Sequence, residues 1–166
     1  MPEGNNLPVF TIVREFAAPR DIVWAAWTEP KRMQQWFGPK GTQATSLKFD
    51  LRPGGISHTK LGMPGGGAIY ARWDFKEVDP PRKLVYLHGV ADEGANVVKH
   101  PMEHRFPSQM LTTVVFEPVG DKTRVTLTWT PVDATAEEIE FFRTAMPGMS
   151  QGWEGSFEQL DTYLAS

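Results

Sequence analysis

Two of the four histidines, His58 and His88, lie in stretches that alternate between apolar and polar residues as a half-buried β-strand does. An imidazole titrates near neutral pH and can donate or accept a hydrogen bond, so each could act as an acid, a base or a ligand contact. The plainer alternatives are a buried histidine with a satisfied partner and a histidine on the surface. The sequence favours the plainer alternatives and leaves the chemical one open.

The segment His100-Pro101-Met102-Glu103-His104 matches H-x-x-E-H, the inverted form of a zinc-peptidase pattern. Zinc chemistry would need both histidines on one face of a stable helix, a third ligand and an open water position. Pro101 and Pro107 bracket this segment, which favours a loop over a helix. We interpret the pattern as a chance cluster, predict no metal and no cofactor, and expect metal analysis of untagged protein to find no stoichiometric zinc.

The other polar groups are weaker candidates for a catalytic or binding role. Tyr70, Arg72 and Asp74 share one face of a predicted strand, where the arginine could bind a ligand carboxylate. That face is opposite to Trp73, so we expect it to be a solvated outer surface. No serine lies in a G-x-S-x-G context, and Gly65-Gly66-Gly67 is not followed by the Lys-Ser or Lys-Thr of a phosphate loop. We therefore assign no catalytic residue from the sequence.

The composition excludes several classes of protein. The 166 residues suit one domain, residues 1–166, and the 17 basic and 20 acidic side chains form no basic block of the kind that nucleic-acid binding needs. The absence of cysteine excludes disulfides and thiolate metal sites. No signal peptide and no run of ~20 apolar residues is present. We expect a cytoplasmic protein without a membrane span, a monomer or homodimer, with flexible residues 1–7.

Alternation and turn residues predict the order of the elements. Pro30 should end a first helix at Thr28, and the Leu47, Phe49 and Leu51 side chains should share one strand face. The segment 91–108 shows no periodicity, which predicts a long, lid-like loop. The predicted strands are 9–16, 44–51, 56–63, 68–78, 83–90, 110–118 and 124–130, and the predicted short helices are 19–28 and 31–36.

The end of the chain predicts an amphipathic helix. Its apolar residues recur every three or four positions, which forms one stripe on a helix, at Met149, Trp153, Phe157, Leu160 and Leu164. Such a stripe must pack on a broad apolar surface, and the strands supply a sheet for that purpose. Thr135 and Glu138 have the spacing of a capping box, which begins an earlier helix. We expect Pro147-Gly148 to separate that helix from the last one.

Short motifs along the chain also resemble those of a known family. In order they are Phe16-Ala17-Ala18-Pro19-Arg20-Asp21-Ile22-Val23-Trp24, Trp36-Phe37-Gly38-Pro39, Asp50-Leu51-Arg52-Pro53-Gly54-Gly55, Glu77-Val78-Asp79-Pro80-Pro81-Arg82-Lys83-Leu84, Thr123-Arg124-Val125-Thr126-Leu127 and Gly152-Trp153 with Leu160 and Tyr163-Leu164. They resemble the homologues of the activator of the heat-shock-protein-90 ATPase, in the START-like (SRPBCC, birch-pollen-allergen-like) superfamily. The resemblance implies an α+β helix-grip fold: a curved antiparallel sheet of about six or seven strands wrapped on a long C-terminal helix, with two short helices after the first strand.

The superfamily commonly has a cavity for an apolar small molecule between sheet and helix, and the resemblance implies one here. The alternative is an interior that side chains fill completely. Gly152 and Gly155 favour the cavity, because a glycine inside a helix costs about 1 kcal/mol relative to alanine and so calls for a reason such as close approach of another element or a ligand. The simpler alternative for both glycines is packing of the helix on the sheet. The expected wall residues are Phe49, His58, Trp73, Phe75, His88, Phe116, Trp129, Trp153 and Phe157, with Leu127 on the same inward face.

Three functions follow from this resemblance. The first is binding of a hydrophobic or aromatic small molecule. The second is a cyclase-like or hydrolase-like enzyme in the same cavity, in which His58 or His88 acts as acid or base on a polyketide-like substrate. The third is a co-chaperone-like domain that docks on a chaperone ATPase. We rank it last, because the sequence lacks the additional N-terminal domain of the eukaryotic activators.

Overall fold

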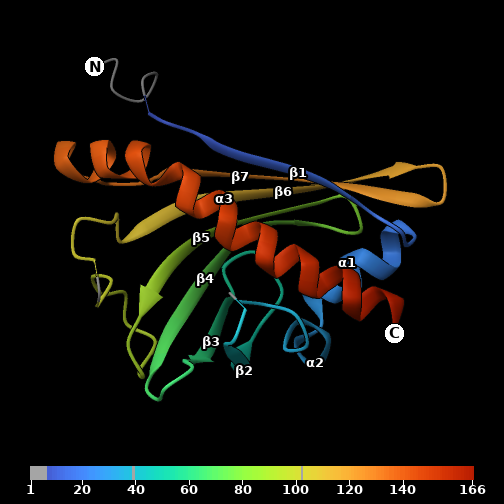
Figure 1. Ribbon diagram of the computed structural model, residues 1–166, viewed down its shortest axis with the longest axis horizontal. Helices are drawn as coiled ribbons and strands as arrows, with labels where there is room; N and C mark the ends of the chain where they lie inside the picture. Colours follow the sequence, from blue (N-terminus) through green and yellow to red (C-terminus); the bar gives the residue numbers. More distant parts are fainter. Residues whose placement is uncertain (1–6, 39, 102) are drawn as a thin grey trace.

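The computed structural model describes residues 7–38, 40–101 and 103–166, so most of the predicted flexible segment 1–7 lies outside the described residues. Its elements follow the predicted order (Figure 1). They are β1 (Phe10–Phe16), α1 (Arg20–Thr28), α2 (Pro30–Met33), β2 (Gln43–Phe49), β3 (Ile56–Gly62), β4 (Ala68–Asp79), β5 (Lys83–Ala91), β6 (Gln109–Val119), β7 (Lys122–Pro131) and α3 (Ala136–Ala165).

The strands form one curved antiparallel sheet of seven strands in the order β1-β7-β6-β5-β4-β3-β2. Short turns join most consecutive strands, as an antiparallel meander requires. Figure 1 shows α3 lying across one face of this sheet, with α1 and α2 at one end of it. The α+β helix-grip prediction is confirmed.

One strand face was predicted wrongly. Leu47 is 48% exposed, whereas Phe49 and Leu51 pack against the core. The register of β2 against β3 shifts between Ser46 and Lys48, which is a β-bulge. An extra residue reverses the alternation of side chains at that point, so Leu47 does not share a face with Phe49.

The break predicted at Pro147-Gly148 is also wrong, because α3 is one helix of 30 residues with Pro147 inside it. A proline costs about 3 kcal/mol within a helix, since it removes one hydrogen bond and clashes with the preceding turn. Buried side chains on both sides, from Phe142 to Met149 and Trp153, offset that cost. Figure 1 shows the helix changing direction between its orange first part and its red second part. The capping box of Thr135 and Glu138 is confirmed at its start.

Length alone does not make α3 a membrane helix. Across the described ranges, no helix is both long and apolar enough to span a bilayer.

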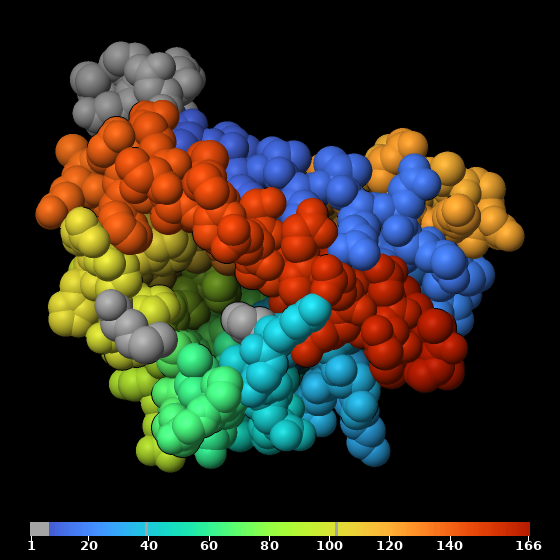
Figure 2. Space-filling view, viewed as in Figure 1, coloured from blue at the N-terminus to red at the C-terminus, as the bar shows by residue number. Residues whose placement is uncertain are grey.

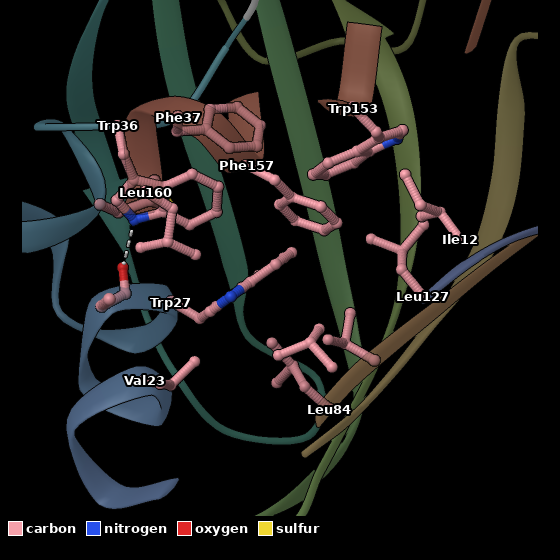
Figure 3. Close-up of a cluster of buried hydrophobic side chains, with 14 of the residues drawn as sticks. Ile12, Val23, Trp27, Trp36, Phe37, Leu84, Leu127, Trp153, Phe157 and Leu160 are labelled. Atoms are coloured by element: carbon pink, nitrogen blue, oxygen red, sulfur yellow. Dashed lines mark hydrogen bonds between the residues drawn. The ribbon is translucent and has the colours of Figure 1, made fainter. Parts of the chain in front are cut away.

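The core is centred on Trp27 of α1, which is fully buried. Its ring stacks on Trp153 at 5.9 Å between centroids and lies 6.4 Å from Phe157, so α1 and α3 meet through aromatic side chains. Trp36 follows α2, packs on Trp27 at 4.9 Å and donates from Nε1 to the Ala26 carbonyl. Figure 3 shows these rings converging between the helices and the strands. Side chains therefore fill this end of the space beneath α3.

Polar contacts attach α3 to β1 and to the segment after α2. Arg14 on β1 reaches the helix and pairs with Glu154 at 3.0 Å and with Asp161 at 2.5 Å. Ser156 and Gln159 both donate to the Gly38 carbonyl at 2.8 Å, which holds the segment after α2 against the helix. These bonds add to the aromatic contacts that hold α3 on the sheet.

A substitution at Phe157 tests how much the aromatic core contributes to the free energy of unfolding. Phe157→Ala should lower the free energy of unfolding by about 3–5 kcal/mol, because it removes a fully buried ring that also contacts Phe16 and leaves a cavity. Val13→Ala, at a side chain 53% exposed on β1, should change it by less than about 0.5 kcal/mol. Urea denaturation of both variants measures the difference. Equal losses would show that Phe157 does not anchor the helix.

Candidate functional site

A narrow apolar hollow of about 180 Å³ lies between the sheet and the middle of α3. The sheet contributes Leu61, Ala71, His88 and Trp129 to its wall. The helix contributes Met149, Gly152, Trp153 and Ser156, and the segment after α2 contributes Phe37 and Gly38. Figure 2 shows a recess on this face of the molecule, between α3 and the segment that follows β5.

A wider hollow of about 320 Å³ adjoins the narrow one. The two share Leu61, Ala71, His88 and Trp129, so they meet along one stretch of the sheet. The wider hollow extends toward the loop 92–108 and is lined there by Val90, His100, Glu103, Phe106 and Met110. A molecule in the narrow hollow would therefore be covered by α3, and one in the wider hollow by the loop.

His88 and Trp129 belong to the walls of both hollows. Their rings stack with centroids 5.4 Å apart, and Trp153 from α3 meets Trp129 edge to face at 5.7 Å. Within the described part of the chain, neither His88 Nδ1 nor Trp129 Nε1 has a hydrogen-bond partner, although both atoms are buried. Such atoms are uncommon, because a buried polar group without a partner costs about 1–3 kcal/mol.

Burial lowers the pKa of His88 from its ordinary 6.5 to about 4. The cause is the apolar surroundings, which disfavour the charged imidazolium. The ring keeps some accessible surface because it faces the hollows. His88 is therefore a neutral imidazole at neutral pH, with one nitrogen able to donate and the other able to accept.

The loop 92–108 is attached to the first part of α3. Phe106 packs on Phe141 and Phe142 at 6.3 and 6.2 Å between centroids, and the Arg105 guanidinium lies 4.5 Å from the centre of the Phe141 ring. Lys99 pairs with Glu138 in the first turn of the helix. The first part of α3 thus holds the loop that contributes His100, Glu103 and Phe106 to the wider hollow.

The structure brings three of the expected wall residues, His88, Trp129 and Trp153, to the hollows. Leu127, which was expected on the same inward face, is buried in the core. The others lie outside both hollows: Phe49, His58, Trp73, Phe75, Phe116 and Phe157. Most of these pack into the core around Trp27 and Tyr86, so they face inward as predicted but meet other side chains.

His58 is a buried histidine with a partner. Its Nε2 lies 3.1 Å from the Asp92 carbonyl oxygen, and its ring stacks on Tyr70. Arg72, its neighbour in the register of β3 and β4, forms a two-pronged ion pair with Asp74 and donates to the Ala95 carbonyl. These residues hold the turn after β5, and Arg72 does not line either hollow.

The described residues of the H-x-x-E-H segment do not form a metal-binding group. Met102 lies outside the described residues, and no three His, Asp or Glu side chains gather in a metal-binding group within the ranges that the structure describes. Glu103 instead accepts hydrogen bonds from Arg105, which hold the pKa of Glu103 at about 2. Its carboxylate is therefore ionised and already paired beside the wider hollow.

Several residues that line the hollows were not among the wall residues expected from the sequence. Met149, Gly152 and Ser156 are spaced by three and four positions, so the helical period could have added them to Trp153. A Cβ at Gly152 would meet no atom within 4 Å, whereas a Cβ at Gly155 would contact Lys40 at 3.6 Å. The absence of a side chain at Gly152 thus leaves part of the hollow open. Long-range packing brings Phe37 to the narrow hollow, and no local sequence pattern predicts this position.

The sequence model of the family described as "Activator of Hsp90 ATPase homolog 1-like protein" matches residues 17–165. The chain belongs to this family. The match begins directly after β1 and extends to the last residue of α3, and it confirms the resemblance to START-like proteins.

Solved structures of this fold come from several bacteria. A protein of Mycobacterium smegmatis is 29% identical, with a TM-score of 0.77 over 94% of this chain and 90% of its own. A protein of Arthrobacter aurescens is also 29% identical, with a TM-score of 0.79 over 95% of this chain and 86% of its own. A family member from Silicibacter pomeroyi shares the fold at 19% identity, with a TM-score of 0.69 over 95% and 98% of the two chains. No curated protein sequence matches significantly.

The buried imidazole predicts a pH dependence of stability. Above pH 6.5 His88 is neutral in both the folded and the unfolded chain, so it contributes nothing. Between pH 6.5 and 4 the unfolded chain binds a proton that the folded chain does not, and the free energy of unfolding should fall by up to about 3 kcal/mol. His88→Phe should lack this component of the fall. Urea denaturation at pH 7.5, 5.5 and 4.5 compares the two proteins, and parallel pH profiles would contradict the assignment.

Proposed function

We propose that this protein binds a small hydrophobic or aromatic molecule in the two adjoining hollows between its sheet and α3. The observation that carries the proposal is the wall around His88, where stacked aromatic side chains and an uncovered Gly152 border open space in an otherwise packed interior. Protein interiors are close-packed by default, so a hollow with aromatic walls between two main elements calls for a function.

The size and charge of the hollows define the ligand further. Cavities of ~150 Å³ accept benzene, and ligand sites usually measure ~300–1,000 Å³. Volumes of about 180 and 320 Å³ therefore suit a molecule of one or two rings in each hollow. No Lys or Arg among the described residues lines either hollow, and the one carboxylate, Glu103, is paired with Arg105. These walls suit an uncharged ligand.

Gly152 offers a direct test. Gly152→Leu places a side chain into the open space of the narrow hollow, so it should weaken binding of one-ring and two-ring aromatic compounds at least about tenfold, equivalent to about 1.4 kcal/mol. Stability should stay equal or rise by less than about 1 kcal/mol, because leucine has the higher helix propensity. Quenching of tryptophan fluorescence by a panel of such compounds, flavonoids and fatty acids gives the affinities.

Gly148→Leu is the matched control. Gly148 lies in the same helix and is exposed, and a Cβ added there would likewise meet no atom within 4 Å, but Gly148 lines neither hollow. This variant should bind the panel as the unmodified protein does. Equal weakening by the two variants would place the ligand elsewhere, and no quenching by any compound in the unmodified protein would refute the binding proposal.

The enzyme alternative now depends on His88. His58 is bonded to the Asp92 carbonyl away from the hollows, whereas His88 faces both of them. A pKa of about 4 keeps His88 neutral but makes it a weak base, so it suits hydrogen bonding better than proton abstraction at neutral pH. Turnover of a polyketide-like substrate that His88→Phe abolishes would favour the enzyme. The co-chaperone function and the cytoplasmic location stay predictions.

A further inference from the structure

We infer that one elongated, uncharged ligand occupies both hollows at once, with one end beneath α3 and the other beside the loop 92–108. The inference rests on the proposed binding function and adds the shape of the ligand: about three linked or fused rings, or an apolar chain of similar length. The residues that line both hollows carry it. They are Leu61 of β3, Ala71 of β4, His88 of β5 and Trp129 of β7.

The narrow hollow alone is small for a ligand site. Its volume of about 180 Å³ lies below the ~300–1,000 Å³ of usual sites, and the wider hollow, at about 320 Å³, lies at the lower end of that range. Two separate ligands would each lose translational and rotational freedom on binding, whereas one longer ligand loses it once. Because the hollows adjoin, a single ligand that fills both is favoured over two small ones.

The stretch of wall where the hollows meet carries no charge at neutral pH and includes one small side chain. Burial lowers the pKa of His88 to about 4, so its imidazole is neutral at pH 7, and the other three shared side chains are apolar or aromatic. Alternation along β4 puts Ile69, Ala71 and Trp73 on the inner face, and Ala71 is the smallest of them. A ligand that lies over Ala71 therefore extends from one hollow into the other without meeting a charge.

Beyond the shared stretch, different elements bound the two ends of the site. Among the described residues, α3 contributes to the narrow hollow only, and the loop 92–108 contributes to the wider hollow only. Met149 and Trp153 at the narrow end are each 8% exposed, whereas Met63 and Phe106 at the wider end are half-buried. A substitution at either end can therefore change one hollow and leave the other as it is.

Two fluorescent compounds that are uncharged at pH 7 and differ by one ring test the inference: N-phenyl-1-naphthylamine and 1-naphthylamine. The unmodified protein should bind one equivalent of N-phenyl-1-naphthylamine. It should bind this compound at least about tenfold more tightly than 1-naphthylamine, equivalent to about 1.4 kcal/mol, because the added ring buries further apolar surface. The emission of each compound during titration gives its affinity, and titration at protein concentrations well above Kd gives the stoichiometry.

Variants then block one end at a time. Gly152→Leu fills the narrow hollow, and Ile69→Trp places a larger side chain at the wider hollow, which is the only one of the two that Ile69 lines. Each should weaken binding of N-phenyl-1-naphthylamine at least about tenfold. The smaller 1-naphthylamine fits within the narrow hollow, so Gly152→Leu alone should weaken it. Met63→Trp blocks the wider hollow from another position and should act as Ile69→Trp does, so the test does not depend on the folding of one variant.

Leu87→Trp is the matched control for the two tryptophan variants. Leu87 is a half-buried aliphatic side chain on β5, and it lines neither hollow. This variant should keep both affinities. The ratio of the two affinities is compared within each protein, so a general weakening of binding does not mimic the effect.

The outcomes separate the two proposals. Two bound equivalents of N-phenyl-1-naphthylamine, or equal affinities for the two compounds, would overturn the single elongated ligand and leave the binding function standing. An affinity for N-phenyl-1-naphthylamine that is unchanged in Gly152→Leu, or in both variants at the wider hollow, would confine the ligand to one hollow and overturn the inference equally. Failure of both compounds to bind the unmodified protein would count against the binding function as well.

Discussion

The contact of Trp27 with Trp153 and Phe157 is the interaction on which the rest of the structure depends. It joins α1 to α3 through rings that are buried or nearly so, and it fixes the distance between the long helix and the sheet. Aromatic side chains bury ~150–250 Å² each and prefer offset or edge-to-face contacts, so such a cluster has few alternative arrangements. Because the cluster fills only one end of the space beneath α3, it also decides where open space can remain.

The walls of the open space are mostly apolar, which favours recognition over catalysis. His88 is held neutral by its surroundings, and the one carboxylate at the wider hollow is paired with Arg105. General acid–base chemistry works best with groups whose pKa lies near the working pH. In the proposed binding function, the hydrophobic walls would supply most of the affinity.

The sequence predicted the sheet well because alternation along a strand states directly which side chains face inward, as with Trp73 and Phe75 on β4. It failed where local rules and packing disagree. Pro147 should have ended a helix, but the buried stripe on both sides outweighs it. The wall was only partly predicted, since alternation cannot tell an inward residue that meets Trp27 from one that borders open space. That difference depends on α1, whose position relative to the strands is set by long-range contacts.

The attachment of the loop 92–108 to the first part of α3 has a consequence for how such proteins diversify. Phe106 and Lys99 attach the loop beside the wider hollow to the first part of α3, whereas the Trp27 cluster lies beyond Pro147 under the second part of the helix. Substitutions in this loop can reshape the wider hollow while the cluster that secures the fold stays intact. The shape of the hollow can therefore vary at little cost in folding.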